Sequence, residues 1–486
     1  MTWTSLNAWV AAPEIFLLCA TCAILLLDLF ISDAKRHITY VLTLITLGVT
    51  AALVLNGHDA HSNLAFSGLF LADPMASYAK LAMIVGVALV LIYGRSYAAA
   101  RGLFRGELFT LSLFSLLGMM VMASASNFLA LYVGLELMSL SVYALVALNR
   151  ESTQSTEAAM KYFILGALAS GMLLYGISML YGSTGSLDIF EVSKSIQSGQ
   201  ANSLLAVFGI VFVVTGLGFK FGAVPFHMWV PDVYQGAPTP ITQLISTAPK
   251  AAVFVFTLRI LAQALEGFAP DWRGMLMVLA VLSMGLGNIT AISQTNIKRM
   301  LGYSTISHMG FVLLGILVAN PVGYSAALFY VIAYILMSAA AFGVIMLLSR
   351  KGFEADQIAD LKGLNQRSPW FAAMMLFTMF SMAGIPIFVG FFAKLAVLKA
   401  VVYSGFVGLA VIAVVFSLIG AFYYLRVVKV MYFDDATDNS PIEAGADAKL
   451  VLSVNCLLLL VLGFMPDRLM NLLSDAVSQS FNTLPF

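Results

Sequence analysis

Long runs of hydrophobic residues, separated by short polar or Pro/Gly-rich stretches, occupy almost the whole chain. Most of these runs reach the roughly 20 apolar residues that a helix needs to cross a bilayer. Cutting the chain at its charged and Pro/Gly-rich interruptions predicts about fourteen spanning helices. They begin near residues 9, 37, 72, 107, 128, 157, 203, 239, 272, 300, 322, 369, 404 and 449. The pattern therefore predicts an all-α polytopic membrane protein.

The composition agrees with this prediction. Of the 486 residues, 61% are hydrophobic and 10% are charged, with a mean hydropathy of +0.95, whereas soluble domains carry about 25% charged residues. A net charge of +1 gives nucleic-acid binding no electrostatic support. The sequence contains no motif that is typical of a flavin, haem, iron–sulfur or metal site. We therefore expect no cofactor bound by this chain itself.

The basic residues of the loops lie mainly on one side of the predicted spans. With the N-terminus placed outside, fifteen Lys and Arg residues fall in cytoplasmic loops and three in outer loops. The cytoplasmic set is Lys35, Arg36, Arg95, Arg101, Arg105, Arg150, Lys298, Arg299, Arg350, Lys351, Lys362, Arg367, Arg426, Lys429 and Lys449, and the outer set is Lys194, Arg273 and Arg468. Since cytoplasmic loops carry the excess of positive charge, we expect both termini on the outer side.

Seven basic residues remain inside predicted spans, where a charge costs about 2.5–3.5 kcal/mol on insertion scales. Four of them, Lys80, Lys161, Arg259 and Lys399, are expected to reach a headgroup or a local ion pair by extending their side chains. Lys161 is the least certain of these, because Glu157 lies one helical turn before it.

The other three, Lys220, Lys250 and Lys394, and the mid-span Glu136 are harder to explain as structural. Their polar or helix-breaking neighbours are Tyr132, Ser139 and Tyr143 for Glu136; Gly216, Gly218, Gly222 and Pro225 for Lys220; Gln243, Ser246, Thr247 and Pro249 for Lys250; and Gly384, Pro386 and Gly390 for Lys394. Ion pairs that only hold helices together are the alternative, but buried pairs are weak stabilisers once desolvation is counted.

Two spans, those that carry Lys220 and Lys394, are predicted to be broken by their Gly and Pro residues. Discontinuous helices in corresponding halves of a membrane protein point to an ion pathway at mid-membrane. Spans 4–8 and 9–13 are interpreted as two inverted five-helix repeats. Each repeat has a titratable residue on its second helix (Glu136, His308) and a lysine on its broken fourth helix (Lys220, Lys394). Without its position in the repeat, His308 would be interpreted as a histidine that only packs in the protein core.

This division predicts four segments. Residues 1–106 form an N-terminal three-helix segment, 107–265 the first repeat and 266–432 the second repeat. Residues 433–486 contain an acidic loop, the last span and a C-terminal tail.

Four stretches together resemble the antiporter-like membrane subunits of proton-pumping NADH:quinone oxidoreductase (respiratory complex I) and the related multisubunit cation/proton antiporters. They are "LYVGLELMSLSVYAL", "GFKFGAVPFHMWVPDVYQGAPTPITQLISTAPK", "NIKRMLGYSTISHMG" and "GIPIFVGFFAKL". The resemblance covers essentially the whole chain. The chain length and Lys394 are most similar to the family member that lies nearest the quinone-proximal small subunits.

The resemblance implies a proton relay. Glu136 and Lys220 would be its essential pair, Lys250 the relay at the repeat boundary, His308 a connecting station and Lys394 the residue nearest the outer exit. It also implies a bacterial inner membrane location, a neighbouring antiporter-like subunit and small membrane subunits as partners. FMN, iron–sulfur clusters, the NADH site and quinone would belong to partner subunits.

We hypothesise that the Glu136–Lys220 separation changes during turnover and moves a proton towards Lys394, since burial favours a neutral amine and a nearby carboxylate favours an ammonium. Lys161 is a further candidate for this relay. We assign His227 and Asp232 a supporting role at the first break, beside Pro225, by hydrogen bonds to freed backbone groups.

Pro386 is the counterpart of Pro225 at the second break. Three alternatives stay open: a Na⁺(K⁺)/H⁺ antiporter subunit, a quinone-binding subunit and a structural scaffold.

Overall fold

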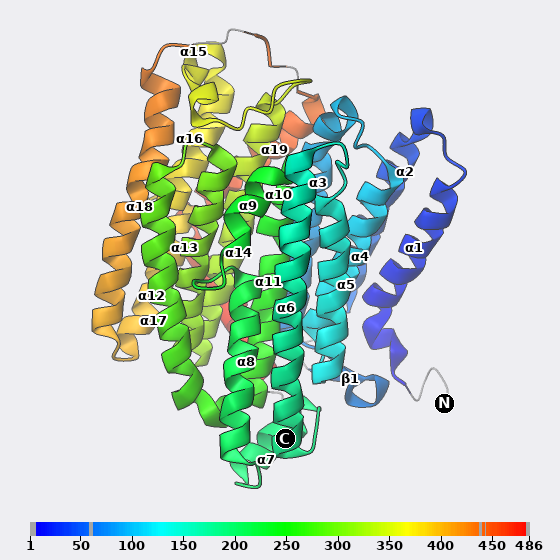
Figure 1. Ribbon diagram of the computed structural model, residues 1–486, viewed down its shortest axis with the longest axis vertical. Helices are drawn as coiled ribbons and strands as arrows, with labels where there is room; N and C mark the ends of the chain where they lie inside the picture. Colours follow the sequence, from blue (N-terminus) through cyan, green and yellow to red (C-terminus); the bar gives the residue numbers. More distant parts are fainter. Residues whose placement is uncertain (1–5, 58–61, 437–439, 443, 483–486) are drawn as a thin grey trace.

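The computed structural model describes residues 6–57, 62–436, 440–442 and 444–482, and these are almost entirely helical. Figure 1 shows the helices standing side by side along one common direction. Their bounds are α1 Ala12–Asp28, α2 His37–Asn56, α3 Pro74–Ala100, α4 Gly106–Ser124, α5 Phe128–Val146, α6 Thr153–Thr184, α7 Ile189–Gln197, α8 Ser203–Phe221, α9 Trp229–Gly236, α10 Thr239–Ser246, α11 Ala248–Thr257, α12 Ala269–Ser293, α13 Ile297–Leu317, α14 Pro321–Leu348, α15 Leu364–Arg367, α16 Pro369–Ala383, α17 Val389–Tyr403, α18 Val407–Phe433, α19 Ala446–Phe464 and α20 Pro466–Asn482. A short hairpin pairs β1 (Asn63–Ala65) with β2 (Phe70–Ala72).

Thirteen helical stretches within the described ranges are long and apolar enough to cross a membrane, and α16 is a shorter apolar helix. Placed end to end, α16 and α17 make up the remaining span (Figure 1). The prediction of an all-α membrane protein with about fourteen spans is therefore confirmed.

Both predicted helix breaks are present. α8 ends at Phe221 and α16 at Ala383, and each is followed by a glycine in the left-handed conformation, Gly222 at φ 75° and Gly384 at φ 84°. Glycine adopts this conformation without the steric cost that a side chain brings. A third break, which the sequence analysis did not predict, separates α10 from α11 at Thr247 (φ −112°, ψ −97°).

One pair of backbone hydrogen bonds occurs twice, on opposite ends of the bundle. Each pair ties the start of the second helix of a predicted repeat to the loop that follows its third helix. The first pair runs from Phe128 N to Leu187 O and from Ile189 N to Ser126 O, and the second from Ile297 N to Asp356 O and from Ile358 N to Thr295 O. Every residue of the second pair lies 169 positions after its counterpart (297 − 128, 356 − 187). This supports the division into 107–265 and 266–432, which stays a prediction.

The centre of the bundle is the junction of the two predicted repeats. Each span has a most apolar stretch, and its burial differs between spans. In Thr239–Ala264 this stretch is fully buried and in Ile297–Leu317 94% of it is buried, whereas in Val407–Phe433 only 33% of it is buried. Polar side chains on α10, α11 and α13 are therefore isolated from lipid, which is a requirement for an internal proton path.

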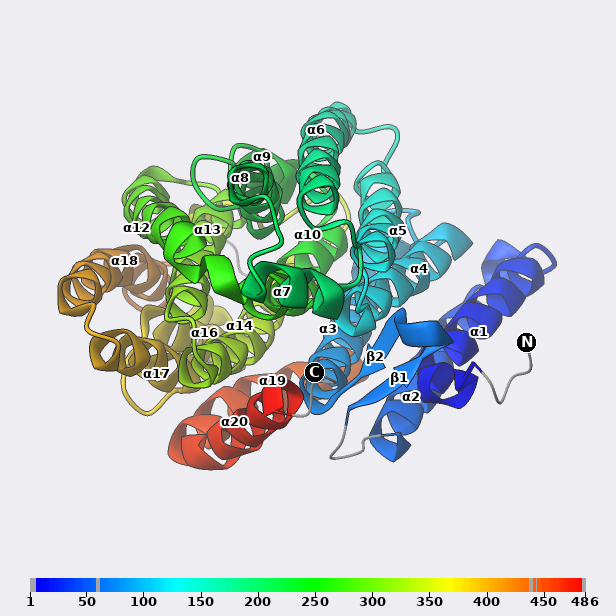
Figure 2. The ribbon, with the colours of Figure 1, turned by 90° about the horizontal axis from the view of Figure 1, so that it is seen from below.

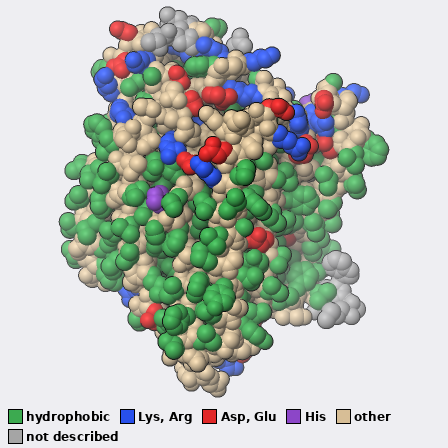
Figure 3. All heavy atoms as spheres, in the orientation of Figure 1, with side chains coloured by type: hydrophobic (Ala, Val, Ile, Leu, Met, Phe, Trp, Pro, Cys, Tyr) green, Lys and Arg blue, Asp and Glu red, His purple; other side chains and the backbone are tan. Residues whose placement is uncertain are grey.

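The two faces of the bundle differ. Figure 3 shows Lys and Arg side chains gathered at the upper end, whereas hydrophobic side chains cover the belt below. Figure 2, seen from below, shows α7, the β-hairpin and α20 at the other face. The tail that follows the last span is a helix, α20, whose apolar residues Leu473, Ala476 and Val477 are buried. Of the predicted acidic loop, residues 437–439 and 443 lie outside the described ranges.

Candidate functional site

Lys220 lies in the last turn of α8, just before the first break, and its side chain is buried. Its ammonium donates to Ser139 Oγ on α5 at 3.0 Å and to Ser170 Oγ on α6 at 3.3 Å. Three helices of the first predicted repeat therefore meet at this nitrogen.

Glu136 lies one helical turn before Ser139 on α5, the serine that binds the Lys220 ammonium. Among the described residues the two make no ion pair, and Glu136 Oε1 is buried without a hydrogen-bond partner. Buried carboxylates are normally paired. The structure thus brings the predicted pair into the same region, but the two side chains do not form an ion pair. Two serine hydroxyls accept hydrogen bonds from the Lys220 ammonium instead.

Lys250 follows the third break, on α11, and is 1% exposed. Its ammonium donates to the backbone oxygens of Lys220 at 3.4 Å and Phe221 at 3.2 Å. These are C-terminal carbonyls of α8, which lack partners within their own helix and carry partial negative charge. Lys250 is therefore linked to the Lys220 region through the backbone of the broken helix.

A row of buried polar residues precedes Lys250, with Thr239, Gln243 and Ser246 on α10 and Thr247 at the third break. Thr239 Oγ1 and Gln243 Oε1 have no hydrogen-bond partner within the described chain. Because buried polar atoms are almost always satisfied, these two oxygens stand out from the rest of the row. The row gives Lys250 a polar approach from the upper end of the bundle.

A hydroxyl bridge crosses from this row to the second predicted repeat. Ser246 Oγ accepts from Ser338 Oγ at 2.8 Å. Tyr334 lies one turn from Ser338 on α14, and its hydroxyl contacts Thr305 Oγ1 at 2.7 Å. The Tyr334 ring also lies 5.1 Å from the His308 ring. The bridge thus leads from α10 to His308.

His308 is buried on α13 with both ring nitrogens paired to tyrosines. Nδ1 contacts the Tyr330 hydroxyl at 2.7 Å and Nε2 contacts the Tyr424 hydroxyl at 3.0 Å. Tyr424 also hydrogen-bonds Ser304. An imidazole between two hydroxyls can pass a proton from one nitrogen to the other side of the ring.

Lys394 lies on α17 and folds back onto the end of α16. Its ammonium donates to Met382 O at 3.2 Å, Ala383 O at 3.0 Å and Ser417 Oγ at 2.9 Å. The Lys394 nitrogen lies 5.5 Å from the centre of the ring of Phe311, which stands three residues after His308 on α13. The helices that carry His308 and Lys394, α13 and α17, therefore pack against each other.

Lys220 and Lys394, which the predicted repeats make equivalent, lie at different positions relative to their helix breaks. Lys220 stands two residues before the left-handed Gly222, whereas Lys394 stands ten residues after Gly384. On the second helix, the 169-residue spacing aligns His308 with Ser139 and Thr305 with Glu136. The two halves thus share their architecture, but not the position of each titratable residue.

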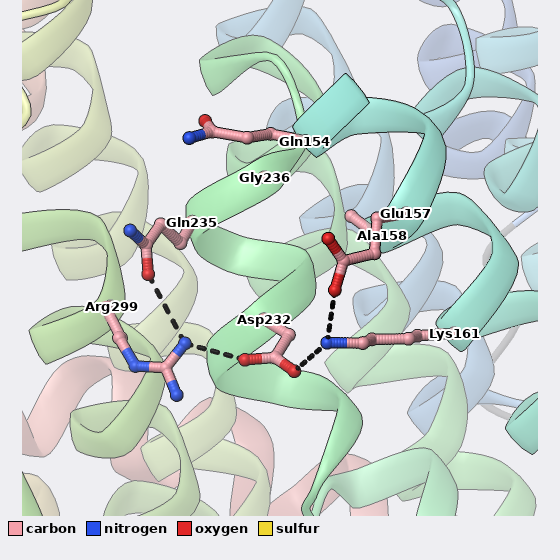
Figure 4. Close-up of a pocket in the computed structure, with 8 residues that line it drawn as sticks. All are labelled: Gln154, Glu157, Ala158, Lys161, Asp232, Gln235, Gly236 and Arg299. Atoms are coloured by element: carbon pink, nitrogen blue, oxygen red, sulfur yellow. Dashed lines mark hydrogen bonds and ion pairs between the residues drawn. The ribbon is translucent and has the colours of Figure 1, made fainter. Parts of the chain in front are cut away.

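Lys161 belongs to a separate ionic cluster near the upper end of α6 (Figure 4). It contacts Glu157 Oε1 and Asp232 Oδ2, both at 2.8 Å. Asp232 Oδ1 accepts from Arg299 at 2.6 Å, and Arg299 also reaches Gln235. These side chains line a polar cavity of about 140 Å³. The cluster ties α9 to α6 and to α13.

At the first break, Asp232 therefore binds two side-chain cations instead of the freed backbone groups that we expected. Burial would raise its pKa, but the hydrogen bonds from Lys161 and Arg299 outweigh burial and hold the pKa below its usual value. His227 is half-buried, and its Nδ1 has no hydrogen-bond partner among described residues. Pro225 and Pro386 follow the left-handed glycines, as predicted.

Two other basic residues inside spans form buried ion pairs. Lys80 contacts Glu14 at 2.6 Å and Arg259 contacts Asp73 at 2.8 Å. Lys298, assigned to a loop from the sequence, is instead buried in the first turn of α13, where it donates to Ala237 O at 2.7 Å. Within the described part of the chain, no cluster of three His, Cys, Asp or Glu residues is arranged to hold a metal ion.

Sequence reasoning missed the hydroxyl groups that connect the titratable residues: Ser170, Ser338, Ser417, Tyr330, Tyr334 and Tyr424. They lie in apolar runs, where the sequence gives no signal that distinguishes them from packing residues.

Comparisons with known proteins agree with the resemblance. Residues 125–420 match the family model described as NADH:quinone oxidoreductase/Mrp antiporter, TM. NADH-quinone oxidoreductase subunit N of Laribacter hongkongensis is 58% identical over 486 residues, covering 100% of both chains. The subunit N of Thiobacillus denitrificans is 57% identical over 471 residues, covering 97% of this chain and 98% of the relative.

Solved structures give the same fold. A chain of respiratory complex I from Thermus thermophilus has a TM-score of 0.82 and 30% identity, covering 96% of this chain and 100% of that chain. A chain of the Mrp complex from Dietzia has a TM-score of 0.84 at 20% identity, covering 98% and 99%, and shows the fold alone. Because full-length relatives at these identities carry that name, this chain belongs to the NADH-quinone oxidoreductase subunit N family, within the larger NADH:quinone oxidoreductase/Mrp antiporter family.

Proposed function

We propose that this chain is a proton-translocating membrane subunit of a bacterial NADH-quinone oxidoreductase and moves protons as quinone is reduced elsewhere in the complex. The observation that carries the proposal is the buried polar row from Lys220 and Lys250, through the hydroxyl bridge, to His308 and Lys394. The row spans both predicted repeats. The names of full-length relatives support the same function.

The Glu136–Lys220 pair acts as the switch of this relay. When the carboxylate approaches, it compensates the buried ammonium. When it withdraws, Lys220 retains only neutral serine partners, and an uncompensated buried charge is costly. The proton then leaves towards Lys250. The binding of Lys220 by two serines, without an ion pair to Glu136 among the described residues, supports this role for the pair.

Proton release from Lys250 and Lys394 requires a change at the helix breaks. Each ammonium is stabilised by two carbonyl oxygens at the end of a half-helix. Movement of the half-helix withdraws these carbonyls and makes the neutral amine favourable. Conformational input from partner subunits would thus be converted into proton transfer.

We further propose that the loops rich in Lys and Arg face the cytoplasm, with both termini outside. A neighbouring antiporter-like subunit and the small quinone-proximal subunits would flank this chain. FMN, the iron–sulfur clusters and the quinone would be bound by other subunits.

The deciding experiment measures proton translocation by the assembled complex in inverted membrane vesicles with NADH as the electron donor. Glu136→Gln and Lys220→Ala are expected to lower the proton gradient about tenfold or more, in line with the loss of a proton-transfer group. Lys351→Ala, in an exposed loop, is the control. Native electrophoresis verifies assembly. Near-normal translocation in either relay variant would refute the proposal.

The antiporter alternative predicts a different site. Na⁺ or K⁺ exchange requires clustered oxygen ligands, whereas the buried relay here consists mainly of lysines, which repel cations. A proton gradient that depended on Na⁺ in the same vesicles would favour the antiporter instead.

A further inference from the structure

Two adjoining surface cavities meet at Lys399, a residue that the proton relay does not use. One cavity, of about 400 Å³, lies between α14, α17 and α20. The other, of about 440 Å³, lies along α17 and α18. Leu395, Lys399 and Tyr403 line both of them. The two cavities therefore adjoin at these three side chains, one on each side of α17.

The two cavities differ in polarity. The first, the polar cavity, contains Lys399, Asp467, Asn471 and Ser474 among apolar side chains such as Phe392 and Met470. The second is lined by aliphatic side chains such as Val407, Val411 and Val415, apart from the shared Lys399 and Tyr403. A ligand that fills both must have a polar head and an apolar tail.

The charges in the polar cavity are opposite and unpaired. Lys399 and Asp467 are both exposed. Within the described part of the chain, neither forms an ion pair with the other or with another side chain. The buried Lys80 and Arg259, by contrast, each have a carboxylate partner. A zwitterion that presents an anion to Lys399 and a cation to Asp467 satisfies both charges.

The depth of the site fits a membrane lipid. Tyr403 ends α17 and is 83% exposed, as is typical of aromatic residues at the membrane–water interface. From Val407 to Val415 the apolar cavity follows α18 for about 12 Å, at 1.5 Å per residue. The polar cavity thus lies at the membrane surface, and the apolar cavity runs inward.

We propose that this site binds phosphatidylethanolamine. Lys399 donates to the lipid phosphate, Asp467 accepts from the primary ammonium of the headgroup, and one acyl chain lies along α18. Choline headgroups lack the N–H donors that Asp467 requires, and the extra negative charge of phosphatidylglycerol is repelled by Asp467. Free phosphate leaves the apolar cavity unfilled.

The test uses the assembled complex, reconstituted in vesicles of equal phosphatidylethanolamine and phosphatidylglycerol and then delipidated mildly. Native mass spectrometry counts the retained lipids. Lys399→Gln is expected to lose one bound phosphatidylethanolamine, whereas Lys351→Gln loses none. Asp467→Asn is expected to shift the preference towards phosphatidylglycerol by roughly fivefold, since one charge near a membrane surface contributes about 1 kcal/mol. Asp475→Asn, on the same helix, leaves the preference unchanged.

Val411→Trp provides a second variant that leaves both charges in place. It fills the apolar cavity and is expected to reduce phosphatidylethanolamine retention. Unchanged retention in both Lys399→Gln and Val411→Trp would overturn the proposal. A density map of the whole complex with a protein helix in the α17–α18 cavity would overturn it as well.

Discussion

Lys250 and Lys394 make the same contact at the two broken helices. Lys250 donates to the last two carbonyls before Gly222, and Lys394 donates to the last two carbonyls before Gly384. The lysines themselves come from different places: Lys250 from the neighbouring span and Lys394 from the second half of its own span. The two lysines are thus equivalent in the helix ends that they cap, and not in their spacing along the chain.

This relationship allows the capping role to be separated from the proton-carrying role. Lys250→Gln keeps an N–H donor for the carbonyls of α8 but cannot carry a proton. We expect proton translocation to fall by about tenfold or more, with little change in the melting temperature of the assembled complex. Lys250→Leu removes the cap as well and is expected to cost a further 1–3 kcal/mol or so of stability.

Thermal shift and proton translocation, measured on the same preparations, distinguish the two variants of Lys250. The control is Lys351→Gln. If Lys250→Gln pumped at the wild-type rate, Lys250 would be a structural cap only.

The tyrosines around His308 give a second prediction. Tyr424→Phe leaves His308 Nε2 buried without its hydroxyl partner, which costs about 1–3 kcal/mol, and interrupts the row between His308 and Ser304. Proton translocation should fall several-fold. Tyr40→Phe, on α2, is the control, because the buried Tyr40 ring packs against Phe104 and Phe109 and not against His308. Equal loss in the two variants would argue against a role for the hydroxyl in the relay.

The helices and both glycine breaks were predictable because their signals are local. Runs of apolar residues set the spans, and Gly222 and Gly384 stand beside Pro225 and Pro386. The break at Thr247 was missed, since Pro249 alone is also compatible with a helix start at N1 or N2.

The contacts of the relay could not be predicted from local sequence. Tyr424 reaches His308 across 116 residues, and Ser338 reaches Ser246 across 92. Such pairs depend on how helices pack, and serine or tyrosine inside an apolar run carries no pattern that reveals its partner. Lys298 was placed in a loop because it stands beside a span boundary, yet α13 begins at Ile297 and turns its amine inward.

The left-handed glycine of the first break is expected to tolerate no side chain. A Cβ at Gly222 would lie 2.6 Å from Val230 Cγ2, in addition to the unfavourable φ of 75°. The conformation alone costs about 1–2 kcal/mol, and overpacking adds about 1–3 kcal/mol. Gly222→Ala should therefore lower the stability and yield of the assembled complex.

Gly352→Ala is the matched control for this substitution. Gly352 has a similar φ of 79°, but a Cβ there meets no atom within 4 Å. It should show only the conformational cost. Equal destabilisation of the two variants in thermal unfolding would show that contact with Val230 contributes nothing.

The ionic cluster of Figure 4 predicts that substitutions of its members lower proton translocation to different extents. Asp232 binds both Lys161 and Arg299, so Asp232→Asn removes two ion pairs and leaves two cations near each other. Lys161→Ala removes one partner and leaves the Asp232–Arg299 pair intact. Because Asp232 lies on α9, which continues the broken span towards Lys250, we expect Asp232→Asn to lower proton translocation several-fold and Lys161→Ala to lower it less than twofold.

The salt dependence of translocation tests whether this order has an electrostatic origin. All three side chains are partly exposed, at 29–42%, so added salt should screen their attraction. Raising the ionic strength should weaken translocation in the wild type but not in Asp232→Asn, where salt screens the repulsion between the two remaining cations. A Lys161→Ala loss as large as that of Asp232→Asn would show that Lys161 itself carries protons, and that the cluster belongs to the relay.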